Sequence, residues 1–318
     1  SMERFTLFWE ILVSKARDEP TRRVQQQFTA TQSIFTLKAG GIDLTATFLS
    51  PVEHSIPFSY LSLSAVSNDG ASHSVQVYTD ISAEWVSGDN GLLVNWSTKV
   101  EDPTAGIITH QVQLANEETF KEIGDHIQRE TNLIRLANIS ILMTQGTTYQ
   151  TGADTDVRAQ FIQHGVLLNT TDSEFRAVQD RWPIFAYAKD LGDVGSGGVQ
   201  NAVVFSVGHV RDPAIQYIVE GGGLQERGIA SFHSDFTDAL GRANTFDAKV
   251  KSDALSVSEH YAGIAALSVR QAFAATEITI SRGAGGSWNT SDILIFMKGV
   301  CCVLYLQTTT DLLYRNIE

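Results

Sequence analysis

The side chains best suited to chemistry are scattered along this chain rather than grouped in a known catalytic spacing. Its eight histidines stand singly, and neither an HExxH nor a CxxC pattern occurs. Zinc sites usually draw several such ligands from short, fixed spacings, so we expect no metal and no cofactor. A GxSxG nucleophile elbow and an assignable Ser/His/Asp set are also missing. The glycine runs at 195–198 and 283–286 do not open a helix after a strand, which predicts loops rather than phosphate-binding turns.

Aromatic residues offer a second kind of chemistry, which is the stacking of sugar rings. Trp85, Trp182 and Trp288 could together form such a platform. Large aromatic side chains are more often buried in a core or an interface, so burial is the favoured interpretation of all three.

Four Asn-x-Ser/Thr sequons predict a secreted glycoprotein. They begin at Asn95, Asn138, Asn169 and Asn289. The N-terminal residues lack the apolar segment of a signal peptide, so the extracellular location rests on the sequons and on the family resemblance given below. The two cysteines, Cys301 and Cys302, are neighbours and do not suit disulfide geometry.

The overall composition narrows the classes of partner. The chain has 318 residues, a formal net charge of −13, 43% hydrophobic residues and 19% charged residues. This balance is typical of one large or two ordinary globular domains. The negative charge opposes a nucleic-acid backbone, and the longest apolar stretch, 293–306, is too short to span a bilayer and contains Lys298. We therefore expect neither nucleic acid nor a membrane as a partner.

The first two thirds of the chain show the period-two pattern of strands. From 74 to 85 one face carries Val75, Val77, Thr79, Ile81, Ala83 and Trp85, which predicts a half-buried strand. Residues 42–48 and 108–114 repeat the alternation, with His110 on the apolar side, and 202–210 is a continuous apolar run that predicts a buried strand. The sequence Asn68-Asp69-Gly70 predicts a hairpin. Many strands separated by turns favour an antiparallel β-sandwich.

Near residue 230 the period changes to that of a helix. One helix is predicted through Phe236, Leu240, Ala243, Phe246 and Val250, and a second from about 258 to 276. The second is apolar on more than one side, which indicates a helix enclosed by neighbours. The link at 252–256 makes the pair a helical hairpin, and Gly221-Gly222-Gly223 is the expected linker between domains.

Seven segments of the chain carry a family resemblance: residues 58–63, 77–89, 149–154, 181–192, 208–217, 268–279 and 286–292. In this order they resemble the fungal glutaminase A family. The resemblance implies a β-sandwich at 1–225, the start of a six-hairpin (α/α)6 toroid at 226–300 and secretion. It also implies hydrolysis of L-glutamine to L-glutamate and ammonia.

The resemblance also implies where site residues lie. Catalytic carboxylates in such toroids project from the ends of inner helices, which makes Glu277 and Asp292 the expected catalytic residues. Arg270 and Gln271 are the expected substrate-binding residues, although a salt bridge between helices is the favoured role of Arg270.

The chain departs from the family at 129–145, at 226–236 and in a divergent tail at 301–318. We expect an incomplete toroid, with part of the second helix uncovered and available for self-association. We also expect weak activity or none from this chain alone. Two alternatives remain: a non-catalytic sandwich that binds glycan or protein, and a glycoside hydrolase-like enzyme. An enzyme needs convergent carboxylates, and a binding module does not.

Overall fold

The computed structural model describes most of the chain. The described residues are 9–13, 22–50, 58–101, 107–123, 126–127, 131–136, 146–199, 202–210, 213–229, 236–274, 276–283 and 285–297. The predicted tail at 301–318, the sequon at Asn138 and most of the divergent segment 129–145 lie outside this set. No helix of the described residues is long and apolar enough to cross a membrane.

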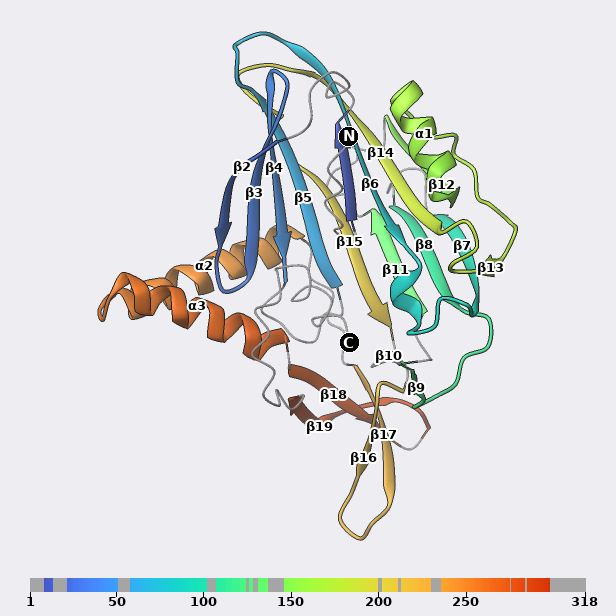
Figure 1. Cartoon of the computed structure of the whole chain (residues 1–318). Coiled ribbons are helices and arrows are strands. Elements are labelled where there is room, and N and C mark those ends of the chain that lie inside the picture. The colour runs from blue at the N-terminus through green and yellow to red at the C-terminus, as the bar shows by residue number, and fades with distance from the viewer. Residues whose placement is uncertain are drawn as a thin grey trace.

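A large antiparallel sheet forms one layer of the sandwich (Figure 1). In spatial order its described strands are β13 (Arg176–Ala177), β7 (Leu93–Glu101), β8 (Ile107–Leu114), β11 (Thr131–Leu136), β15 (Val203–Val210), β5 (Phe58–Ser67), β4 (Ile42–Leu49), β3 (Gln32–Ala39) and β2 (Arg22–Phe28). A smaller antiparallel sheet forms the other layer, in the order β1 (Trp9–Val13), β6 (His73–Ser82), β14 (Pro183–Val194) and β12 (Thr147–Ala153). A short ribbon pairs β9 (Glu122–Ile123) with β10 (His126–Ile127).

The main core lies between these two sheets. From the large sheet, Leu44, Leu63 and Val112 are fully buried, and they belong to one cluster with Val77 and Phe185 of the small sheet. The predicted alternation in 42–48 and 108–114 is confirmed, since every second residue of these strands is buried in this core. The apolar run at 202–210 is confirmed as β15, whose residues 203–208 are all buried.

The strand at 74–82 is buried on both faces in its second half, and not on one face as the alternation predicted. The reason is helix α1 (Asp154–His164), which the sequence did not predict. Val157 and Phe161 of this helix pack on Tyr78. Arg158 of the same helix donates to both carboxylate oxygens of the buried Asp80, at 2.8 and 3.0 Å.

The predicted hairpin at Asn68-Asp69-Gly70 is wrong. Gly70 has the positive φ of a turn residue, but β5 pairs with β4 and β15, whereas β6 pairs with β1 and β14. The turn therefore connects the two layers of the sandwich instead of two neighbours in one sheet. A turn signal identifies a reversal of the chain, and pairing partners are chosen by packing over longer distances.

The predicted helical hairpin is confirmed as α2 (Phe236–Leu255) and α3 (Glu259–Ala274). Phe246 and Phe273 stack between the two helices, with ring centroids 5.4 Å apart. Ala239 and Ala243 of α2 pack on Leu49, Tyr60 and Val204 of the large sheet. Figure 1 shows the hairpin lying across the ends of β2 to β5, with its far end projecting away from the sandwich.

After α3 the chain returns to strands, where further helix was expected. An antiparallel sheet in the order β16 (Ile215–Ile218), β17 (Leu224–Ile229), β18 (Thr276–Arg282) and β19 (Trp288–Met297) places 276–297 beside the strands that precede the helices. Gly221-Gly222-Gly223 forms the turn between β16 and β17, with Val219 N donating to Gly223 O at 2.9 Å, so it is not a linker. The division into domains at residue 225 remains a prediction, and that position falls within β17.

The described residues contain one helical hairpin of the expected toroid. The prediction that the second helix is enclosed is wrong for its outer face, because Tyr261 is 48% exposed and Ile264 is 61% exposed. The exposed face agrees with the expectation of an incomplete helical layer. The glycine runs at 195–198 and 283–286 are turns, as predicted, after β14 and between β18 and β19.

Candidate functional site

Glu277 and Asp292 lie on strands and not at the ends of helices as expected. Glu277 is half-buried near the start of β18, opposite Phe296 of β19. Asp292 lies four residues before Phe296 on β19, so the Cα atoms of the two carboxylates are roughly 13 Å apart at about 3.3 Å per residue. Pairs of carboxylates that act on one glycosidic bond are about 5–9.5 Å apart. That range is measured between carboxyl groups, and the carboxyl group of Asp292 is bound to Arg227 of β17.

Asp292 binds a fully buried arginine of β17, which is separated from β19 by β18 in the same sheet. The guanidinium of Arg227 reaches past β18 and donates to Asp292 Oδ2 at 2.9 Å and to the Asp292 backbone oxygen at 2.7 Å. It also donates to the hydroxyl of Thr279 at 2.9 Å. The hydrogen bond from Arg227 is the main reason that the pKa of Asp292 lies below its ordinary value. Asp292 remains a predicted catalytic residue, but its contacts are those of a counterion that holds the sheet together.

Arg270 joins the helices to the sandwich. Its guanidinium donates to Thr29 O at 2.8 Å, to Gln32 O and to the hydroxyl of Ser33 at 3.0 Å. The favoured prediction of a salt bridge between helices is therefore wrong, because the acceptors are in the turn between β2 and β3. Burial lowers the pKa of Arg270, and the charge of Asp247 opposes that effect. Gln271, the next residue, is exposed on the helix surface.

Asp247 completes this junction from α2, and sequence reasoning did not single it out. Its carboxylate accepts from the hydroxyls of Thr29 at 2.5 Å and Thr31 at 2.8 Å. It also accepts from Thr31 N at 3.1 Å and from the side-chain amide of Gln32 at 3.1 Å. The useful signal was the group of hydroxyl and amide side chains at Thr29, Thr31 and Gln32, which can donate several hydrogen bonds to one carboxylate. Arg270 is therefore a positioning residue for the helices in this structure, and its substrate-binding role stays a prediction.

The sandwich contains a Ser/Asp/His arrangement whose order does not suit nucleophilic catalysis. Asp69 lies between the other two residues, accepting from the Ser67 hydroxyl at 3.0 Å and contacting His73 Nε2 at 2.8 Å. Hydrogen bonding to His73 is the main reason that the pKa of Asp69 is lowered to about 2. A catalytic serine needs the histidine as its direct base. The arrangement stabilises the turn between the two layers.

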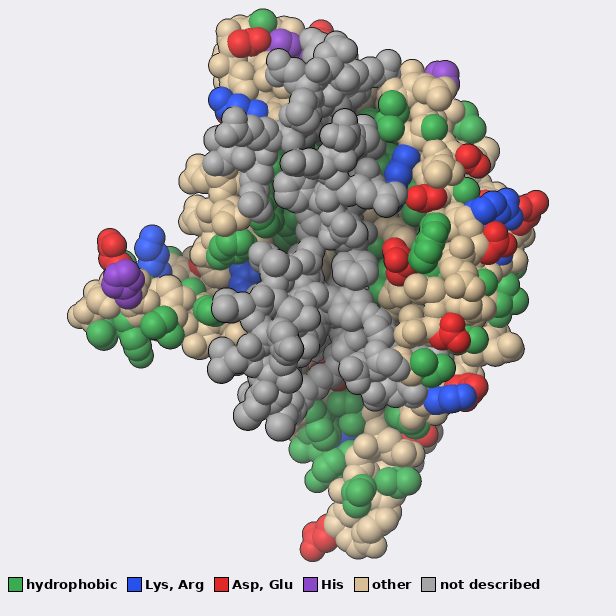
Figure 2. Space-filling model, viewed as in Figure 1, with side chains coloured by type: hydrophobic (Ala, Val, Ile, Leu, Met, Phe, Trp, Pro, Cys, Tyr) green, Lys and Arg blue, Asp and Glu red, His purple; other side chains and the backbone are tan. Residues whose placement is uncertain are grey.

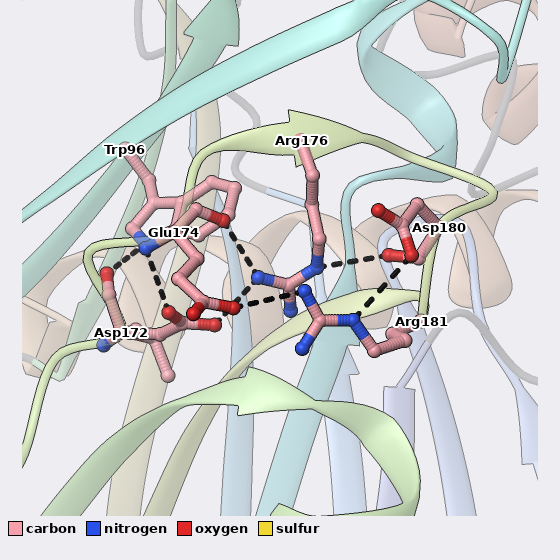
Figure 3. A network of polar contacts seen from close by, with 7 residues as sticks. Trp96, Asp172, Glu174, Arg176, Asp180 and Arg181 are labelled. Atoms are coloured by element: carbon pink, nitrogen blue, oxygen red, sulfur yellow. Dashed lines mark hydrogen bonds and ion pairs between the residues drawn. The ribbon is translucent and has the colours of Figure 1, made fainter.

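A second arginine cluster lies at the β13 edge of the large sheet (Figure 3). Arg176 has a 5% exposed side chain and donates to Asp172 Oδ2 at 2.6 Å, to Glu174 O at 2.7 Å and to Asp180 O at 2.9 Å. Its Cζ atom lies 5.3 Å from the centre of the Trp96 ring. The Nη2 atom of Arg176 is buried and has no hydrogen-bond partner among the described residues.

The surface over Arg176 carries exposed charged and aromatic groups. Arg181 donates to Glu174 Oε2 at 2.9 Å, and both side chains are more than half exposed. The neighbouring Phe175 is 50% exposed and Trp182 is 38% exposed. Arg181 and Trp182 both have positive φ, at 56° and 34°. Of the tryptophans predicted to be buried, Trp85 is buried, but Trp182 and Trp288 are 38% and 45% exposed.

The predicted glycosylation sites differ in exposure. Asn169 follows α1 and Asn289 lies on β19, and both are exposed. Asn95 is half-buried on β7, opposite Gln113 of β8. Among the described residues, no group of three or more His, Cys, Asp or Glu side chains is arranged to hold a metal ion.

Comparison with known proteins identifies relatives for most of this chain. The family model described as "Domain of unknown function (DUF5127)" matches residues 31–253. A protein named Glutaminase A from Aspergillus oryzae is 32% identical over 295 residues, which covers 86% of this chain and 40% of the relative. A probable glutaminase from Arthroderma benhamiae is 28% identical over 292 residues, which covers 83% of this chain and 32% of the relative. The chain therefore spans less than half the length of either relative.

Proposed function

Because the chain belongs to the DUF5127 family and resembles fungal glutaminases along most of its length, we propose that it is part of a glutaminase. The reaction is hydrolysis of the side-chain amide of L-glutamine. The oxygen of water bonds to the amide carbon, the carbon–nitrogen bond breaks, and the nitrogen leaves as ammonia after taking a proton. The similarity to Glutaminase A over 86% of the chain is the observation that carries this proposal.

The chemistry requires a base for water, a proton donor for ammonia and groups that hold the amino-acid end of glutamine. Glu277 is our candidate for the proton-transferring carboxylate, because the half-buried β18 position gives it a rigid support. Asp292 and Arg270 are engaged with Arg227 and with the 29–33 turn. The described residues therefore supply a scaffold and one candidate carboxylate for proton transfer, Glu277. This supports our expectation that the chain alone is weakly active or inactive.

A coupled ammonia assay tests the activity of this chain. We expect release of ammonia from glutamine near background for the purified 318-residue chain, and substantial release by the Aspergillus oryzae relative. Catalysis depends on groups held within fractions of an ångström, and one of the two predicted carboxylates, Asp292, is bound to Arg227. Robust turnover that Glu277→Gln abolishes would show that this chain is an enzyme with Glu277 as a catalytic residue.

A chimera tests whether this chain belongs to a glutaminase at all. Residues 31–297 replace the matching part of the Aspergillus oryzae relative, and folding is checked by circular dichroism and thermal unfolding. We expect the chimera to keep glutaminase activity. A folded chimera without activity would contradict the proposal, and loss of activity on Glu277→Gln in an active chimera would assign that residue to the site.

The two other functions proposed from the sequence are less well supported. A glycoside hydrolase-like reaction needs two convergent carboxylates, and one of the two candidates, Asp292, is bound to Arg227. A non-catalytic binding module is compatible with the sandwich, but the comparisons favour the glutaminase proposal.

The location of the protein, its glycosylation and its self-association are further proposals. We propose secretion and N-glycosylation at the exposed Asn169 and Asn289, which a mass shift on enzymatic removal of N-glycans from protein secreted by a fungal host would check. Loss of the shift in the double Asn→Gln variant would assign the glycans to these positions. We also propose that the chain self-associates through the exposed face of α3, which carries Tyr261 and Ile264.

A further inference from the structure

We propose that the surface over Arg176 binds a neutral glycan, with Phe175 and Trp182 as stacking residues. This binding site would be independent of glutamine hydrolysis. Phe175 and Trp182 are adjacent in sequence to Glu174 and Arg181, which form an ion pair at 2.9 Å. The Phe175 ring packs edge-on against Trp96, with ring centroids 5.0 Å apart, and remains 50% exposed. The two segments that this ion pair joins therefore each carry an exposed aromatic side chain.

The groups at this surface match the two chemical faces of a sugar. A sugar ring presents C–H groups on its faces, which pack on aromatic rings, and hydroxyls around its edge, which both donate and accept hydrogen bonds. Glu174 and Asp180 offer acceptors, Arg181 offers donors, and all three side chains are at least 55% exposed. A binding surface for hydroxyls needs both kinds of group within a short distance.

The buried guanidinium of Arg176 points to a missing partner. Its Nη2 atom has no acceptor in the described part of the chain, and leaving a buried charged donor unsatisfied is costly. Figure 3 shows the Arg176 and Arg181 guanidinium groups between the Glu174 and Asp180 side chains. Arg181 is held by exposed ion pairs, which contribute little to stability, so a ligand can displace its side chain.

The charge balance of the cluster favours a neutral ligand. Three carboxylates, those of Asp172, Glu174 and Asp180, accompany two guanidinium groups. The chain as a whole has a formal net charge of −13, which also disfavours an anionic polysaccharide.

The backbone beneath this surface is held in place before any ligand binds. The guanidinium of Arg176 donates to Glu174 O, which precedes it in the chain, and to Asp180 O, which follows it. These two hydrogen bonds hold the two segments together. Trp182 O accepts from the first backbone N–H of α1, at Asp154, at 3.2 Å. Such pre-organisation reduces the entropy lost on binding.

Affinity electrophoresis in native gels tests the proposal. The probes are laminarin and yeast mannan as neutral polysaccharides, and polygalacturonate as an anionic one, each with the intact 318-residue chain. We expect at least one neutral probe to retard the chain. Phe175→Ala and Trp182→Ala should each weaken that binding by about tenfold or more, which corresponds to about 1.4 kcal/mol. Glu174→Gln should weaken it as well.

Trp288→Ala is the matched control, because Trp288 is a similarly exposed tryptophan on another sheet. Near-ultraviolet circular dichroism and thermal unfolding confirm that each variant is folded. No retardation by either neutral probe, equal loss of binding in Trp288→Ala, or stronger binding to polygalacturonate would overturn the proposal. Unchanged binding in the folded Phe175→Ala and Trp182→Ala variants would overturn it too. A protein partner would then explain the exposed aromatic residues.

Discussion

His110 shows how a single residue can make the stability of this fold depend on pH. It is fully buried between the sheets, stacks on Tyr187 with ring centroids 4.7 Å apart, and contacts the Thr98 hydroxyl through Nδ1 at 2.8 Å. Its Nε2 lies 3.5 Å from the backbone oxygen of Ala186, which can only accept, so Nε2 carries the proton of a neutral ring. Burial lowers the pKa of His110 to about 3.

We predict that acidification from pH 6.5 toward 3 removes stability through this residue. In that window the unfolded chain binds a proton at His110 and the folded chain does not, so the free energy of unfolding falls as pH falls. The contribution is at most about 1.4 kcal/mol per pH unit. Urea unfolding at several pH values, for the wild type and for His110→Gln, should show a steeper loss in the wild type. Parallel curves would contradict the prediction.

The ion pair of Arg227 and Asp292 shows that the sequence does not predict the partner of a single charged residue. The sequence singles out Asp292 through a family resemblance, but no local pattern indicates that an arginine 65 positions earlier binds it. Long-range partners of this kind decide whether a carboxylate is available for chemistry or held by a counterion.

At the scale of elements, the junction between the helical hairpin and the 29–33 turn fixes where α2 and α3 lie. Asp247 and Arg270 approach this turn from the two helices and bind its side chains and backbone. Ala239 and Ala243 add only small apolar contacts to the sheet. The polar contacts therefore determine the orientation of the hairpin.

We predict that Asp247→Ala loosens the hairpin at a cost of about 1–3 kcal/mol, because donors at 29–32 lose their acceptor. Hydrogen exchange should then show faster exchange in α2 and α3 than in β4 or β15. Lys249→Ala is the matched control on the same helix, since its bond to Asp253 is largely exposed and contributes about 0–1 kcal/mol. Equal effects of the two substitutions would rule out this role for Asp247.

At the scale of the whole molecule, the helical hairpin leaves apolar side chains without cover. Tyr261 and Ile264 are 48% and 61% exposed, and their spacing puts them on one side of α3. Val257, in the turn before α3, is 67% exposed. Figure 2 shows hydrophobic side chains gathered on the underside of the projecting hairpin and over the C-terminal sheet. Burial of a large apolar side chain contributes about 1.5–3 kcal/mol, so contact between copies would be favourable.

We predict that the purified chain self-associates as its concentration rises, and that Ile264→Lys weakens this association. Sedimentation velocity over a concentration series measures the effect. Leu224→Lys, which changes a 63% exposed leucine of β17, is the control and should behave as the wild type does. A wild type that stays monomeric throughout the series, or a stronger effect of Leu224→Lys, would exclude the α3 face as the contact surface.

The sequence by itself determined the type of several elements. The alternation at 42–48 and 108–114, the apolar run at 202–210 and the helical period after 236 each describe which side of a local segment is buried. These patterns are readable because the burial period follows directly from strand or helix geometry. The family resemblance was equally readable and is confirmed by the comparisons.

Only the tertiary structure decided how these elements pair. Asn68-Asp69-Gly70 and Gly221-Gly222-Gly223 are both turn sequences, yet the first connects two sheets and the second closes a hairpin. The strands at 276–297 belong to the same sheet as those at 215–229, although helices α2 and α3 separate the two segments in the sequence. The partners of Arg227, Asp247 and Arg176 likewise come from other segments of the chain. Local periodicity carries no information about such contacts, because they form only when distant segments pack together.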